Sequence, residues 1–142
     1  MESVPTHPSP RQRLTLARNV VLRLIKDFRP DTVAIEKAFF ANNRNTALLN
    51  VLVDEIHAIA KRQRIQFVSF APSTVKRAVT GNGRARKWEV ARAVVTRYPE
   101  LTVYIGQDRK WKARYHSNMF DAVAVGLAAL GAMRRKTAPS TL

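Results

Sequence analysis

The sequence predicts an α/β fold, because short apolar strands alternate with amphipathic helices along its 142 residues. Thr32–Glu36 and Gln66–Phe70 are brief runs rich in β-branched and aromatic residues, each with helical segments on both sides. Strands between helices are usually parallel and covered on both faces, so they need not alternate apolar and polar residues. Residues 101–105 are a candidate for a further strand. Only two strands are firmly indicated, which predicts a small sheet.

The helices follow from apolar residues at three- and four-residue spacing. The first helix is amphipathic because its apolar residues recur at this spacing: Leu14, Ala17, Val20, Val21, Leu24, Ile25 and Phe28. Its start is indicated by a serine followed by proline at positions 9 and 10, and its end by a proline at position 30. Further helices are predicted over residues 46–62, 73–79, 86–98 and 118–133. We therefore expect one domain over residues 10–133, between a disordered N-terminal stub (1–9) and a disordered basic tail (134–142).

Charge is the strongest global feature: 25 Lys and Arg residues against 10 Asp and Glu residues give a net charge of +15. Such an excess predicts a polyanionic partner. The basic residues are spread over several segments and do not line one amphipathic helix, so nucleic acid is favoured over a membrane surface. The absence of cysteine excludes disulfides and thiolate metal sites. With no secretory signal and no apolar run of about 20 residues, a cytoplasmic protein without membrane contact is expected.

Two carboxylates are candidates for chemistry. Glu36 ends the first strand, at the edge of an α/β sheet where ligands gather, although it could also mark the exit of the chain into solvent. Asp121 begins an apolar helix, where the alternative interpretation is a capping pair with Asn118 that complements the helix dipole. If Glu36 and Asp121 converge, they form a site for Mg²⁺, which prefers carboxylate oxygens.

Basic and aromatic residues could bind DNA around these carboxylates. Lys76 and Lys87 flank a glycine-rich loop over residues 80–86 that also carries Arg84 and Arg86. The loop is not a Walker motif, because the Gly-Lys-Ser/Thr ending is missing. It is interpreted either as an ordinary solvated loop or as a phosphate contact. Phe39 is the first of two consecutive aromatic residues, of which one is expected in the core and the other as a wedge between bases.

Four stretches in this order resemble the RuvC-type Holliday junction resolvases of the RNase H-like superfamily. They are residues 29–40 (RPDTVAIEKAFF), 43–48 (NRNTAL), 71–87 (APSTVKRAVTGNGRARK) and 121–128 (DAVAVGLA), and the likeness covers residues 13–130. The resemblance implies a homodimeric, structure-selective endonuclease that cuts four-way DNA junctions with Mg²⁺ (or Mn²⁺) in recombination and repair. It implies no small organic cofactor.

The resemblance also implies roles for single residues. Glu36 and Asp121 would be catalytic metal ligands, and Phe39 would be the stacking wedge. Lys76 and Lys87 would contact phosphate. Other basic residues proposed to bind DNA are Arg84, Arg86 and Lys112, the last within an added basic aromatic segment over residues 104–115.

The chain departs from the family pattern at two carboxylate positions. In the family, the first catalytic Asp lies on a strand that precedes the first helix. This strand and its Asp are expected to be missing here, so that the sheet lacks its first strands. Asn118 stands where the family has another catalytic carboxylate, and an amide oxygen ligates a cation without neutralising it. Three hypotheses remain open: a junction endonuclease, an impaired paralogue that only binds branched DNA, and a general basic protein of the ribosome or nucleoid. The missing strands also predict poor solubility or association.

Overall fold

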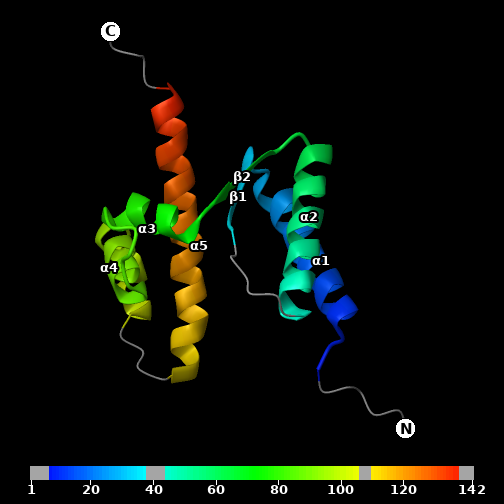
Figure 1. Cartoon of the computed structure of the whole chain (residues 1–142), viewed down its shortest axis with the longest axis horizontal. Helices are drawn as coiled ribbons and strands as arrows, with labels where there is room; N and C mark the ends of the chain where they lie inside the picture. Colours follow the sequence, from blue (N-terminus) through cyan, green and yellow to red (C-terminus); the bar gives the residue numbers. More distant parts are fainter. Residues whose placement is uncertain (1–6, 38–43, 106–109, 138–142) are drawn as a thin grey trace. The chain divides into compact units, whose positions relative to one another are not determined.

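The computed structural model describes residues 7–37, 44–105 and 110–137. Its elements, in chain order, are α1 (Pro10–Phe28), β1 (Thr32–Glu36), α2 (Arg44–Arg62), β2 (Gln66–Phe70), α3 (Pro72–Thr80), α4 (Lys87–Arg97), the 3₁₀ helix η1 (Pro99–Tyr104) and α5 (Lys110–Thr137) (Figure 1). The chain divides into two compact units. The first contains α1, α2 and the first residues of both strands, and the second contains the ends of both strands and everything from α3 onward.

The two strands pair with each other and run parallel. Near the start of the pair, the Gln66 N–H donates to the Asp31 carbonyl at 2.9 Å, and at its end the Lys37 N–H donates to the Phe70 carbonyl at 2.7 Å. Because start pairs with start and end with end, the strands point the same way and both end at one edge of the sheet. This is the only sheet in the residues that the structure describes, and both strands have the predicted bounds.

In the first unit, α1 packs against α2. Ser9 caps α1 as predicted, because its hydroxyl accepts from the Gln12 N–H at 3.2 Å while the Gln12 side chain accepts from the Ser9 N–H at 2.7 Å. The helix ends at Arg29, which adopts a left-handed conformation with φ 44° just before a proline. Among the described residues of this unit, Ile25, Ile59 and Ala60 are buried.

One face of α1 carries an exposed apolar stripe, which we define as Leu16, Val20, Leu24 and Phe28. These residues recur every four positions and are 58%, 58%, 49% and 76% exposed. Of the apolar residues that the sequence gives to this amphipathic helix, Ile25 is buried and Leu14, Ala17 and Val21 are half-buried, whereas Val20, Leu24 and Phe28 are exposed. An exposed apolar stripe of this kind marks a surface that other apolar groups tend to cover.

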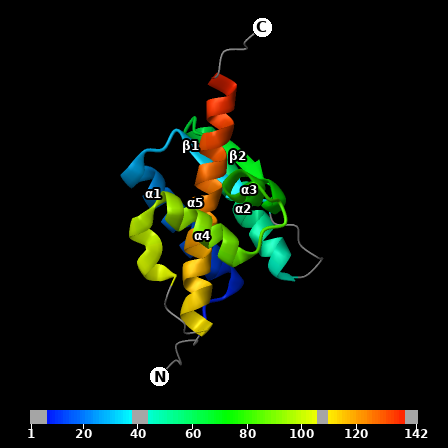
Figure 2. The same cartoon turned by 90° about the vertical axis from the view of Figure 1, so that its left-hand side faces the viewer.

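In the second unit, α5 packs against both α3 and α4 (Figure 2). Its core joins buried residues from three places: α3, the α3–α4 loop with α4, and one face of α5. They are Val75, Ala85, Val90, Val94, Phe120, Ala124, Val125 and Ala128. Ala34 from β1 and Phe70 from β2 pack against this core, so the ends of both strands are fixed on it.

Two sequence-based predictions in the second unit are wrong. The 101–105 segment is not a strand: Pro99 starts a 3₁₀ helix in which Leu101 and Ile105 donate to carbonyls three residues earlier, so local bonds satisfy the backbone. The last helix does not begin near Asn118 but at Lys110, because the intervening residues contain neither proline nor glycine. It continues to Thr137, beyond the expected end. None of the described helices is both long and apolar enough to span a membrane.

We predict that the α1 stripe drives self-association. Replacing Val20 and Phe28 with Gln should weaken association at least about tenfold, since burying one such side chain contributes roughly 1.5–3 kcal/mol. Light scattering across a concentration series measures the change, and Arg13→Gln on the same helix is the control. Unchanged association of the double variant would show that other surfaces hold the copies together.

Candidate functional site

Glu36 is positioned by the core of the second unit. Ala34 precedes it by two residues, and alternate residues of a strand share one face. Since Ala34 packs against the core that includes Phe120 and Ala124 of α5, the Glu36 side chain leaves β1 on the α5 side. The predicted location of Glu36, at the carboxyl end of a parallel strand, is confirmed.

Asp121 lies well inside α5, so it is not the first-turn capping residue that the sequence also allowed. The helix dipole acts only within the first and last turns and has little influence at this depth. Phe120 and Ala124 beside it are buried, whereas Asp121 itself is half-buried. The core therefore fixes the backbone of Asp121 and leaves its carboxylate at the margin of the core.

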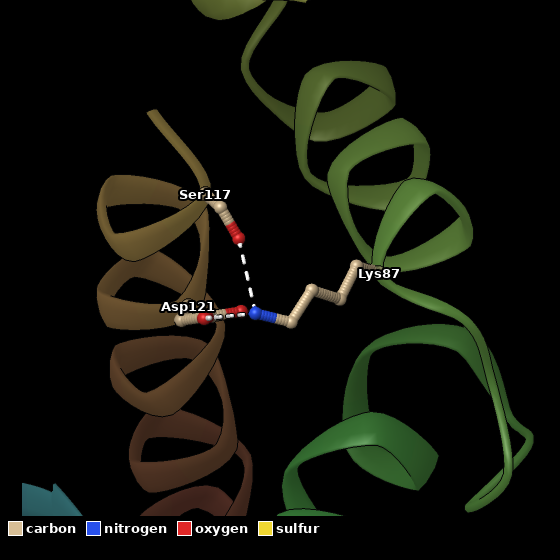
Figure 3. A network of polar contacts seen from close by, with 3 residues as sticks. All are labelled: Lys87, Ser117 and Asp121. Carbon is tan, nitrogen blue, oxygen red and sulfur yellow. Dashed lines mark hydrogen bonds and ion pairs between the residues drawn. The ribbon is translucent and has the colours of Figure 1, made fainter. Parts of the chain in front are cut away.

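Lys87 joins α4 to this part of α5. Its Nζ lies 3.9 Å from Asp121 Oδ2 and donates to Ser117 Oγ at 3.4 Å (Figure 3). Ser117 and Asp121 are four residues apart and share one face of α5, so the ammonium reaches both. The Lys87 and Asp121 side chains are 76% and 43% exposed, so the ion pair contributes only about 0–1 kcal/mol to stability. The main effect of the ion pair is to place the positive charge of Lys87 beside Asp121.

Ser117 was not predicted as a site residue. The prediction placed the start of the last helix near Asn118, which put Ser117 outside it. Once the helix is extended upstream, the four-residue spacing to Asp121 is the signal that would have found Ser117. Asn118 lies three residues before Asp121 and is exposed, and its predicted catalytic role stays a prediction.

The pKa of Glu36 depends on its burial and on three charged neighbours, one of which is Asp121. Glu36 is exposed as a whole residue, yet protein atoms crowd its carboxyl group, and this desolvation is the largest cause of a raised pKa. The negative charge of Asp121 raises the pKa of Glu36 further, while the positive charges of Lys76 and Lys87 lower it. The sum is a raised pKa. Glu36, Asp121, Lys76 and Lys87 therefore form one electrostatic cluster, which we call the Glu36 cluster.

The Glu36 cluster suits a hard divalent cation in part. Its two carboxylates repel each other, and a cation between them would relieve the repulsion that raises the pKa of Glu36. Mg²⁺ is commonly held by one or two carboxylates and keeps several water ligands. However, no group of three or more His, Cys, Asp or Glu side chains gathers anywhere in the described ranges. Within them, Glu36 and Asp121 supply two ligands and no complete shell.

The loop between α3 and α4 is held by its own hydrogen bonds. The Thr80 hydroxyl donates to the Lys76 carbonyl at 2.8 Å and accepts from the Asn82 N–H at 3.1 Å. The Asn82 side chain in turn accepts from the Arg84 N–H at 2.9 Å. Gly81 has a φ of +80°, which favours glycine. Lys76 and Lys87 thus flank a well-organised loop.

The remaining predicted DNA-binding residues are placed in part. Arg84 and Arg86 are exposed on the loop. Phe39 lies outside the described residues. Lys112 lies on α5, but its side chain is outside the described part of the chain. DNA binding by each of these residues stays a prediction.

The class of this protein follows from its similarity to solved structures. The "Thermus thermophilus RuvC structure" covers 96% of this chain with a TM-score of 0.69 and 25% identity, and this chain covers 76% of it. The structure "T. thermophilus RuvC in complex with Holliday junction substrate" matches over the same shares with a TM-score of 0.71 and 25% identity. The chain is thus an α/β protein of the RNase H-like class, as predicted.

The family follows from the sequence comparisons. The family model described as "Crossover junction endodeoxyribonuclease RuvC" matches residues 3–128, so this chain belongs to the RuvC family. A curated relative of that name from Thermomicrobium roseum is 39% identical over 93 residues, which are 65% of this chain and 57% of the relative. Another from Mycobacterium sp. (strain KMS) is 38% identical over 91 residues, which are 63% of this chain and 49% of the relative. The chain thus spans about half the length of these curated relatives.

We predict opposite shifts of the Glu36 pKa in two variants. Asp121→Asn removes a negative charge that raises this pKa, so the pKa should fall. Lys87→Gln removes a positive charge that lowers it, so the pKa should rise. Titration of the Glu36 side-chain carboxyl carbon by NMR measures both shifts, with Asp27→Asn in the first unit as the control. If neither variant moves the Glu36 titration, the two carboxylates are not in one cluster.

Proposed function

We propose that this chain acts in a structure-selective DNA endonuclease of the Holliday junction resolvase type, which hydrolyses phosphodiester bonds in four-way junctions during recombination and repair. The observation that carries the proposal is the grouping of Glu36, Asp121, Lys76 and Lys87 at the carboxyl end of β1, where Lys87 Nζ lies 3.9 Å from Asp121 Oδ2 and all three neighbours act on the Glu36 carboxyl group. Two carboxyl groups from distant parts of the sequence interact at the edge of a sheet, between two lysines. This arrangement combines ligands for a cation with positive charge for a phosphate backbone.

Each residue of the Glu36 cluster has a role in this proposal. Glu36 and Asp121 would hold Mg²⁺ or Mn²⁺, which would supply a Lewis acid for the scissile phosphate and the attacking water. Lys87, held by Ser117 and Asp121, would contact a phosphate oxygen beside the scissile bond, and Lys76 would add a second positive charge for the DNA backbone. The raised pKa of Glu36 means that cation binding must displace a proton more often at low pH, so binding strengthens as pH rises.

The net charge of +15 supports DNA as the partner, and one of the similar structures is described as a complex with a Holliday junction substrate. A homodimer would present two such sites to two strands of one junction, in keeping with the two-fold symmetry of most dimers. The α1 stripe offers an apolar surface for such pairing. The cytoplasmic location stays a prediction.

The experiment is incubation of the purified chain with a labelled four-way junction and Mg²⁺. We expect symmetric nicks that need the cation and that Glu36→Gln reduces at least about a hundredfold, since removing one group that stabilises the transition state commonly costs that much. Glu100→Gln, which removes a surface carboxylate in η1, is the matched control and should cut like the unaltered chain.

Two results would contradict the proposal. Tight junction binding without any product would support the binding-only paralogue. Equal competition by linear duplex would instead support a general basic protein, because charge alone does not distinguish DNA shapes.

A further inference from the structure

Trp88 is a large apolar side chain that the fold leaves in solvent. It is the second residue of α4 and is 57% exposed. Val90 and Val94 of the same helix are buried in the core, and Lys87 reaches Asp121 on α5. Trp88 follows Lys87 directly in the sequence and is turned about 100° from it around the helix axis, and its exposure shows that it lies outside the core.

The surroundings of Trp88 are cationic. Exposed basic residues lie before it, beside it and one helical turn after it: Arg84, Arg86, Lys87 and Arg92. The acidic residue nearest in sequence, Glu89, accepts a hydrogen bond from the Arg86 N–H at 2.6 Å and is thereby used to cap the helix. Four cations surround one indole while the neighbouring carboxylate is engaged in the helix cap, and this excess of positive charge favours a polyanionic ligand. A nucleobase attached to a phosphate backbone matches both the apolar ring and the charges.

The backbone that presents Trp88 is fixed before any ligand binds. The hydrogen bonds through Thr80 and Asn82 organise the preceding loop, and Ala85 is only 2% exposed within the core. Gly83 lies so close to its neighbours that an added Cβ would meet the Ser73 carbonyl at 3.2 Å and the Arg77 guanidinium at 3.4 Å. Because the loop before Trp88 is already ordered, little conformational entropy is lost when a base stacks on the indole.

We propose that Trp88 is a stacking platform for an unpaired nucleobase of the DNA, next to the phosphate that Lys87 contacts. Bases at a branch point are more easily unstacked than bases in a continuous duplex, so such a platform adds affinity for branched DNA. This inference rests on the proposed function only in taking DNA as the ligand. It requires neither a bound cation nor cleavage.

The test is DNA binding without divalent cations, measured by fluorescence anisotropy. Two labelled probes are compared: a duplex with a loop of unpaired thymines and the same duplex fully paired. Trp88→Ala should weaken binding to the looped probe at least about fivefold while changing the paired probe less than twofold, and Trp88→Phe should keep most of the affinity. Val103→Ala, which truncates another exposed apolar side chain (65%), is the matched control and should change neither probe.

A second readout detects the stacking itself. In a Trp111→Phe background, Trp88 is the only tryptophan, and oligothymidine should quench its emission. Thermal unfolding followed by circular dichroism verifies that the variants remain folded. Equal losses on both probes, no loss on either, or unquenched emission would overturn the inference, as would a change in oligomeric state in Trp88→Ala. If these results hold while the junction is not cut, the resolvase proposal fails alone. If the junction is cut while these results fail, only the stacking platform is lost.

Discussion

The structure depends on the anchoring of the β1 end against α5. Ala34 packs on the core that holds Phe120 and Ala124, and this contact fixes both Glu36 and Asp121 relative to one another. Desolvation of its carboxyl group raises the pKa of Glu36, and the negative charge of Asp121 raises it further, so the packing of the core holds two like charges near one another. A protein that keeps such a repulsive pair beside two lysines has the arrangement expected of a site for a cation and a phosphate.

The backbone also positions the positive charges around Glu36 and Asp121. The α3–α4 loop places Lys76 and Lys87 through backbone geometry and its own hydrogen bonds, while surface ion pairing adds little. Membership in the RuvC family and the similarity to a structure solved with a Holliday junction substrate give this arrangement its context. The chain has 25 Lys and Arg residues against 10 Asp and Glu residues, and this excess of positive charge favours a polyanionic partner.

Most of the local structure could be predicted from the sequence, and the errors have separate causes. β1, β2 and the Ser9 cap were predictable because strand composition and capping chemistry are local. The exposure of the α1 stripe could not be predicted, because periodicity shows that a face is apolar without showing what covers it. The start of α5 was misplaced because Asn118 resembles a cap, and this hid Ser117 from the predicted site. That Glu36 and Asp121 meet follows from tertiary packing and was accessible only through the family resemblance.

The most direct test of the account is a titration with Mn²⁺ followed by NMR. A paramagnetic ion broadens the signals of nearby nuclei, so it reports which carboxylates share it. The account predicts that the backbone amides of Lys37 and Ala122, next to the two carboxylates, broaden together at the lowest Mn²⁺ concentrations, and that Glu36→Gln weakens both effects. Broadening of only one of them, or earlier broadening around a carboxylate of the first unit such as Asp27, would contradict a shared cation.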